Sequence, residues 1–155
     1  MAHLSSKDPT ASKKEFDNRA ILSHFFQEGF NKRNLDVIEE TYSPEITYHG
    51  PSIEMHGYKE VKEMMNSYFS AFHDSKITPN DIIAKGDKMV VRFTFEGVHK
   101  GYMEDIPPTG KAIKITGISI CRMEKGKILE EWEEFDQLGL MKQLGMELRS
   151  PEVAH

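Results

Sequence analysis

The second half of the sequence contains two short turns, each between two runs that have the composition of β-strands. Both turns carry a glycine, at Gly86-Asp87 and at Glu124-Lys125-Gly126. Two strand-like runs joined by such a short connection are typical of an antiparallel β-hairpin. The pattern therefore predicts two hairpins in one antiparallel sheet. The four predicted strands are 77–84, 88–99, 112–123 and 127–136.

The first half of the sequence has apolar residues at helical spacing instead. They recur three or four positions apart in three segments, and Asn34 is a candidate cap for the second. Helices followed by a run of antiparallel strands predict the α+β class, with one face of a curved sheet packed on the helices around a pocket. The predicted helices are 16–30, 35–41 and 58–72, with a short strand at 45–50 and a helical turn or two at 139–145.

The length of 155 residues fits one domain. We expect a flexible tail at 1–15, the domain at 16–148 and a second tail at 149–155. The net charge of −5 argues against nucleic acid or an anionic membrane surface as a partner, because phosphate binding needs a concentrated positive field. No run approaches the roughly 18 apolar residues of a membrane span. The single cysteine excludes an internal disulfide, and we expect a reducing, cytoplasmic location.

The segment 127–136 carries acidic residues on both of its faces. Glu131 and Glu133 alternate with Glu130 and Glu134, so two carboxylates turn toward the core whichever face is buried. Burial without a cationic partner raises the pKa of a carboxyl group, which is how an enzyme obtains an acid or base near neutral pH. The alternative, which the spacing alone slightly favours, is a solvent-exposed face with hydrated charges.

A histidine ends the predicted buried face of the strand 88–99. Phe93 and His99 both lie on that face, and a loop with the sequence Pro-Pro-Thr-Gly follows. A histidine at a strand end is more often structural, but its place beside this loop makes it a candidate site residue. His49 and His56 do not have a recognised metal-ligand spacing, and no phosphate-binding loop or nucleophile elbow is present. We expect neither a metal nor a cofactor.

Four segments together resemble one known family. HKGYMEDIPPTGK (99–111) and KILEEWEEFDQLGLMKQLG (127–145) resemble segments of SnoaL-like polyketide cyclases, also called ester cyclases. The segments 31–51 and 55–65 fit the early part of that family, so the resemblance covers about residues 18–146. It implies the cone of the nuclear-transport-factor-like superfamily, in which three helices wrap a curved antiparallel or mixed sheet around a deep apolar cavity.

The resemblance also implies site residues. The family's acid/base carboxylate corresponds to Glu133, and His99 matches the family's histidine before the Pro-Pro-Thr-Gly loop. We therefore predict Glu133 and His99 as catalytic residues, with His49 as an additional group that orients the substrate oxygen. Two positions where the family often has histidine carry Glu131 and Ser119 in this chain. The predicted pocket residues are His49, Ser119, Glu131, Phe93, Phe26 and Phe69.

The resemblance predicts a cofactor-free cyclase that closes a ring in a small apolar carbonyl compound or ester by an aldol-type step. One alternative is a hydrolase or isomerase on the same cone; epoxide hydrolases of this superfamily use an arginine, whereas Arg92 and Arg122 are expected to face away from Glu133. Another alternative is a protein that binds a small molecule without catalysis. Exposed apolar residues on the outer sheet face, including Ile120 and Trp132, predict a homodimer.

Overall fold

The computed structural model describes residues 10–152. Its elements follow the predicted order: two helical segments, a strand, a third helix, four strands and a closing helix, with one additional strand before the third helix. They are α1 (Lys13–His24), the π-helical segment η1 (Phe25–Phe30), α2 (Leu35–Thr41), β1 (Tyr42–Gly50), β2 (Ile53–His56), α3 (Tyr58–Ala71), β3 (Lys76–Lys85), β4 (Lys88–Val98), β5 (Ala112–Glu124), β6 (Lys127–Phe135) and α4 (Gln137–Gln143).

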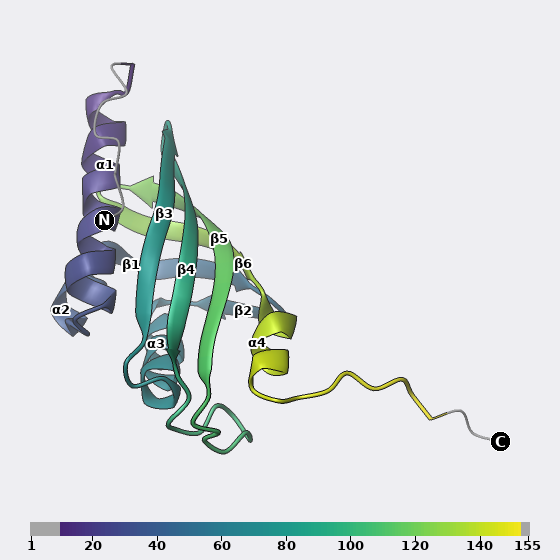
Figure 1. Ribbon diagram of the computed structural model, residues 1–155. Helices are drawn as coiled ribbons and strands as arrows, with labels where there is room; N and C mark the ends of the chain where they lie inside the picture. Colours follow the sequence, from purple (N-terminus) through teal and green to yellow (C-terminus); the bar gives the residue numbers. More distant parts are fainter. Residues whose placement is uncertain (1–9, 153–155) are drawn as a thin grey trace.

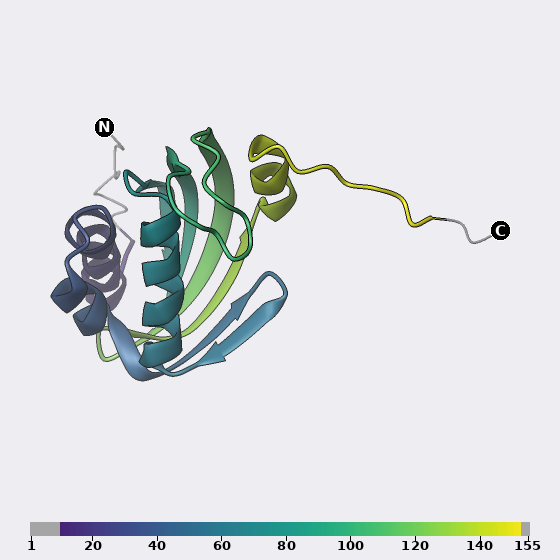
Figure 2. The same cartoon turned by 90° about the horizontal axis from the view of Figure 1, so that it is seen from below.

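The strands form one curved sheet in the order β2-β1-β6-β5-β4-β3. All neighbours are antiparallel except β1 and β6, which run parallel, so the sheet is mixed. The helices α1, α2 and α3 lie on its concave side, and α4 packs near the end of β5 (Figures 1 and 2). The predicted α+β cone is confirmed.

The core lies between the concave face and the helices. Along β4 and β5 the odd-numbered side chains point inward, as the alternation predicts, and most of them are buried. Burial of these apolar side chains against Leu22 of α1 and the aromatic residues of η1 and α3 stabilises the cone, at about 1.5–3 kcal/mol for each fully buried large side chain. The buried side chains of these two strands are Met89, Val91, Phe93, Phe95, Ile113, Ile115, Ser119, Cys121 and Met123.

Some boundaries differ from the prediction. The helix α1 begins at Lys13 rather than at residue 16, because the side chain of Ser12 accepts a hydrogen bond from the backbone N–H of Glu15 and caps it. Residues 13–15 of the predicted tail are therefore helical. The tail segments 1–9 and 153–155 lie outside the described residues. The strand β2 was not predicted, since four residues after a Gly-Pro turn carry little periodicity.

A β-bulge interrupts the alternation in β6. Arg122 is opposite Glu130 and Met123 is opposite Ile128, which leaves Leu129 as an extra residue between the pairs. Ile128 and Glu131 consequently both face the core, although they are three positions apart. Strict alternation along 127–136, which predicts Leu129 on the same face as Glu131, is wrong at this position because of the bulge.

Candidate active site

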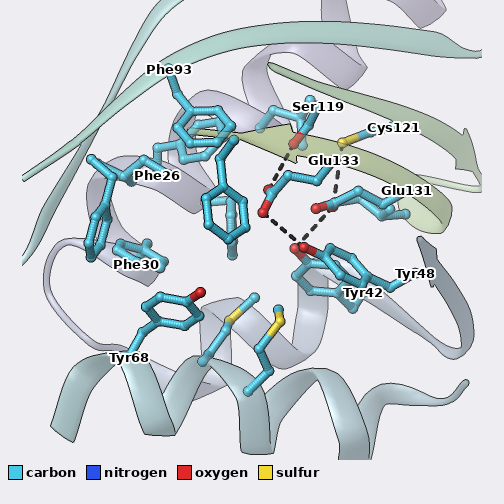
Figure 3. Close-up of a pocket in the computed structure, with 18 of the residues that line it drawn as sticks. Phe26, Phe30, Tyr42, Tyr48, Tyr68, Phe93, Ser119, Cys121, Glu131 and Glu133 are labelled. Carbon is cyan, nitrogen blue, oxygen red and sulfur yellow. Dashed lines mark hydrogen bonds between the residues drawn. The ribbon is translucent and has the colours of Figure 1, made fainter. Parts of the chain in front are cut away.

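A small apolar cavity lies between the helices and the concave face of the sheet. Its volume is about 100 Å³, and its polar groups come from β1, β5 and β6 and, with Tyr68, from α3 (Figure 3). The helices contribute phenylalanine, leucine, methionine and tyrosine side chains. The lining residues are Leu22, Phe25, Phe26, Phe30, Tyr42, Tyr48, Met64, Met65, Tyr68, Ile77, Phe93, Phe95, Ile115, Ser119, Cys121, Ile128, Glu131, Glu133 and Phe135.

Two neutral hydroxyl groups hold the carboxylate of Glu133. The Tyr48 hydroxyl donates to Oε1 at 2.9 Å, and the Ser119 hydroxyl donates to Oε2 at 2.9 Å (Figure 3). Ser119 is directly opposite Glu133 in the β5–β6 ladder, while Tyr48 reaches it from β1. Both carboxylate oxygens are thus fixed, and the side chain is preorganised at the cavity wall.

Weaker contacts hold the neighbouring carboxyl group, that of Glu131. This side chain is 5% exposed; its Oε2 accepts from the Tyr42 hydroxyl at 3.2 Å and from the Cys121 thiol at 3.6 Å. Among the described residues no donor reaches its other oxygen, Oε1. The cavity therefore holds two acids on one face of one strand, with unequal hydrogen bonding.

The surroundings disfavour charge on both acids. Burial raises the pKa of Glu131 to about 8, and the charge of Glu133 adds to the effect. Burial also raises the pKa of Glu133, but the hydrogen bonds from Tyr48 and Ser119 act in the opposite direction. No lysine, arginine or histidine of residues 10–152 lines the cavity. The pair titrates as one coupled unit, with Glu133 the better stabilised anion.

The structure brings most of the predicted pocket residues together. Phe26, Phe93, Ser119 and Glu131 line the cavity with Glu133. Phe69 is one layer away: its ring packs on Phe30, with the centroids 5.0 Å apart, and does not line the cavity.

His99 is not at the cavity, and its predicted pairing with Glu133 requires correction. The side chain is fully buried at the end of β4, and its Nδ1 accepts a hydrogen bond from the backbone N–H of Thr109 at 3.2 Å. The Thr109 hydroxyl lies 3.0 Å from the same nitrogen, and the imidazole packs on Phe72 at 5.4 Å between centroids. The contacts of His99 hold the loop 99–111 in place, and Phe72 separates the imidazole from the cavity-lining Phe95.

His49 is also misassigned as a pocket residue, because it lies on the outer face of the sheet. Its Nε2 is 2.8 Å from Oε2 of Glu130, and its ring stacks on Trp132 with a centroid distance of 5.5 Å. In β1 the inward position belongs to the adjacent residue, Tyr48, which is 2% exposed. His49 therefore has no access to the cavity.

Four polar lining residues were not predicted as site residues: Tyr42, Tyr48, Tyr68 and Cys121. The alternation of β1 was sufficient to place Tyr48 on the same face as Ile46. What the sequence did not show was the parallel pairing of β1 with β6, which brings the hydroxyl of Tyr48 to Glu133. Cys121 is buried on the inward face of β5, and its thiol donates to Glu131.

The described part of the chain has no group of three histidine, cysteine or acidic side chains arranged to hold a metal ion. None of its helices is long and apolar enough to cross a bilayer.

Solved structures with the same fold come from several bacteria. A protein from Jannaschia sp. CCS1, assigned as a SnoaL-like polyketide cyclase, superimposes with a TM-score of 0.82 at 20% identity, over 89% of this chain and 98% of that chain. IdmH from Streptomyces antibioticus, assigned as a polyketide cyclase, superimposes with a TM-score of 0.73 at 23% identity, over 83% of this chain and 99% of that chain. AclR from Streptomyces galilaeus, assigned as a hydroxylase, superimposes with a TM-score of 0.78 at 22% identity, over 89% of this chain and 87% of that chain. At these identities the likeness shows the fold alone.

Comparison with curated proteins found no match. A family model, that of the SnoaL-like polyketide cyclases, matches residues 20–144, which include all six strands and the residues around both cavity carboxyl groups. The chain belongs to the SnoaL-like polyketide cyclase family.

Proposed function

We propose that this protein is a cofactor-free enzyme that moves a proton at the carbon next to a carbonyl group, as in an aldol-type ring closure. The substrate is a small, largely apolar carbonyl compound or ester. The observation that carries the proposal is the pair Glu131 and Glu133 in an apolar cavity, where hydroxyl and thiol groups are the hydrogen-bond donors. Two titratable groups whose surroundings give them different pKa values are suited to general acid/base catalysis, since one keeps its proton while the other is ionised.

Glu133 is the general base in this proposal. Its two hydroxyl donors stabilise the ionised form, while burial keeps its pKa above that of an ordinary carboxyl group and so keeps it basic. The carboxylate removes a proton from the carbon, and the electron pair moves to the carbonyl oxygen. The resulting enolate carbon attacks a second carbonyl of the same molecule, which forms one C–C bond and restores the first C=O bond, and the proton from Glu133 goes to the new alkoxide oxygen.

Glu131 is the hydrogen-bond donor to the enolate oxygen and keeps its proton throughout the step. With a pKa of about 8, it keeps its proton at neutral pH and is a hydrogen-bond donor while Glu133 is ionised. Such a donor stabilises the charge that develops on the oxygen, and it does so in a site from which water is largely excluded.

The hydrolase alternative is less well supported. Epoxide hydrolases of the superfamily pair carboxylates with an arginine, but Arg92 bonds Asp81 and Arg122 bonds Glu130 on the outer side of the sheet. The remaining alternative, a protein that binds a ligand without catalysis, predicts that no proton transfer depends on Glu133.

The experiment measures the exchange of the acidic C–H for solvent deuterium in a panel of aryl β-keto esters, followed by NMR. Glu133→Gln is expected to lower the exchange rate by about 10²–10⁴-fold, the usual contribution of a positioned acid or base. Glu134→Gln is the matched control, because Glu134 is the next residue on the outer face and is exposed. Equal rates in the wild type and Glu133→Gln, with the ligands still bound, would identify the non-catalytic alternative.

A homodimer through the outer face of the sheet is part of the proposal. Ile83, Val90, Ile120 and Trp132 are paired in one row across four strands, and Ile83, Ile120 and Trp132 are exposed. Such a row suits packing against a second copy. Ile120→Lys is expected to produce a monomer in sedimentation, and Leu148→Lys, at an exposed site outside the row, is expected to leave the dimer intact. A wild-type monomer at micromolar concentration would contradict this. The cytoplasmic location and the absence of a cofactor stay predictions.

A further inference from the structure

A second, larger hollow adjoins the cavity. Its volume is about 650 Å³, and it is formed by β2, the turn before it, α3, the loop 99–111 and α4. Four side chains line both spaces: Tyr48, Met64, Tyr68 and Phe135. We call the larger hollow the vestibule, the small cavity the inner chamber, and these four side chains the throat.

Acidic groups lie on both sides of the throat. Glu131 and Glu133 line the inner chamber, whereas Glu60, Glu63 and Glu104 line the vestibule with Glu54. Within residues 10–152, neither space is lined by a lysine, an arginine or a histidine. A hollow that is lined by one sign of charge concentrates ligands of the opposite sign.

The throat itself lies in the field of these charges. The pKa of Tyr68 is raised to about 12, by burial and then by the charges of Glu133 on the inner side and Glu104 on the outer side. The Tyr48 hydroxyl is 2.9 Å from Glu133, so its ring connects the throat to the inner carboxylate. With Tyr48, Tyr68 and Phe135, three of the four throat residues are aromatic, and aromatic faces attract cations.

The inner carboxyl groups also have no counter-charge. Burying a carboxylate without a cationic partner is costly, and hydroxyl donors compensate for the cost only in part. One oxygen of Glu131, Oε1, accepts no hydrogen bond from the described residues, although the side chain is 5% exposed and lines the chamber. When Glu131 is protonated and Glu133 ionised, the pair carries one negative charge, which one positive charge on a ligand complements.

We propose that the throat binds a cationic nitrogen, so that the substrate is an apolar carbonyl compound that also carries an ammonium group. The inference rests on the proposed function, because it places the reacting carbonyl at the Glu131–Glu133 pair. The inner chamber, at about 100 Å³, accepts only a small group, and the remaining body of the substrate lies in the vestibule. A substrate that ends in a carboxylate or phosphate meets like charges in both spaces and is excluded.

Three matched probes test the charge preference by calorimetric titration of the whole protein. They are phenacyltrimethylammonium, its neutral isostere with a quaternary carbon in place of the nitrogen, and an analogue of similar length that ends in a carboxylate. We expect the cation to bind about tenfold or more tightly than the neutral isostere, the range of a cation–π site with nearby carboxylates. The anionic analogue is expected to bind most weakly.

Glu104→Gln removes one charge at the throat and is expected to lower the cation's affinity several-fold while leaving that of the neutral isostere unchanged. Asp105→Asn is the matched control: its carboxylate is adjacent in sequence and exposed, but it lines neither space. Equal affinities for the cation and its isostere, tighter binding of the anion, or no binding of the cation would overturn the inference.

The two proposals fail in different ways. Cation preference without Glu133-dependent proton exchange would refute the enzyme and retain the cation site. Exchange on neutral esters that depends on Glu133, without any preference for the cation, would refute the cation site and retain the enzyme.

Discussion

Replacing Glu131 by glutamine tests whether this carboxyl group is neutral in the folded protein. The pKa of Glu131 is about 8 in the folded state, against an ordinary value of 4.5. Since each pKa unit corresponds to about 1.4 kcal/mol, ionising this group in the folded protein costs about 5 kcal/mol. Glutamine has nearly the same shape and never ionises, so the variant does not incur this cost.

The sign of the effect follows from where the proton is bound. Below pH 4.5 both states are protonated and the contribution of Glu131 to stability is fully present. Between pH 4.5 and about 8 only the unfolded state releases the proton, so the free energy of unfolding falls as the pH rises. Above pH 8 both states are ionised and that contribution is lost.

The assay is urea unfolding of the wild type and Glu131→Gln at several pH values from 5 to 9. We expect the two proteins to have similar stability at pH 5, and the variant to exceed the wild type by up to about 5 kcal/mol at pH 9. Glu124→Gln, at an exposed site at the end of β5, controls for the loss of one negative charge and is expected to show no such trend. Parallel stability curves for the wild type and Glu131→Gln between pH 5 and 9 would refute the reasoning.

Three further predictions concern the site and its support. Tyr48→Phe removes the 2.9 Å hydrogen bond to Glu133, so the pKa of Glu133 rises further and the acidic limb of a pH–rate profile for deuterium exchange, where the general base gains its proton, shifts to higher pH. Gly117→Ala places a Cβ against the ring of Phe93 and 2.8 Å from the backbone oxygen of Glu134, and thermal unfolding is expected to show a loss of about 1–3 kcal/mol. His99→Ala is expected to lower stability by about 2–4 kcal/mol in urea unfolding, with exchange per folded molecule unchanged, because its contacts hold a loop.

Periodicity was sufficient to predict which faces of β4 and β5 are buried, whereas it left the buried face of β6 open. The inward side chains of β4 and β5 follow the alternation without interruption, and α2 spans the predicted residues 35–41. In β6 the alternation failed at Leu129, because a bulge depends on the pairing with β5 and leaves no mark in the strand's own composition.

Which inward residues meet at one cavity depends on positions along the strands, which alternation does not specify. His99 and Phe93 are both inward on β4, but only Phe93 lines the cavity, while His99 is at the strand end beside Thr109. Likewise, the role of Tyr48 follows from the parallel pairing of β1 with β6, a contact between segments about 80 residues apart. Long-range pairing of this kind is absent from local sequence patterns.

The glutamates of β6 show how the two faces of one strand shift the pKa of the same type of side chain in opposite directions. Glu130 points outward, where hydrogen bonds from His49 and Arg122 lower its pKa. Glu131, the next residue, points inward, where burial raises its pKa to about 8. The difference comes first from burial, and then from the hydrogen-bond donors His49 and Arg122, which lie on the outer face and have no counterpart in the described lining of the cavity. Because the side chains that line the cavity offer Glu133 apolar and hydroxyl groups and no cation, its carboxyl group has no ion-pair partner in the described part of the chain and is available for the proposed proton transfer.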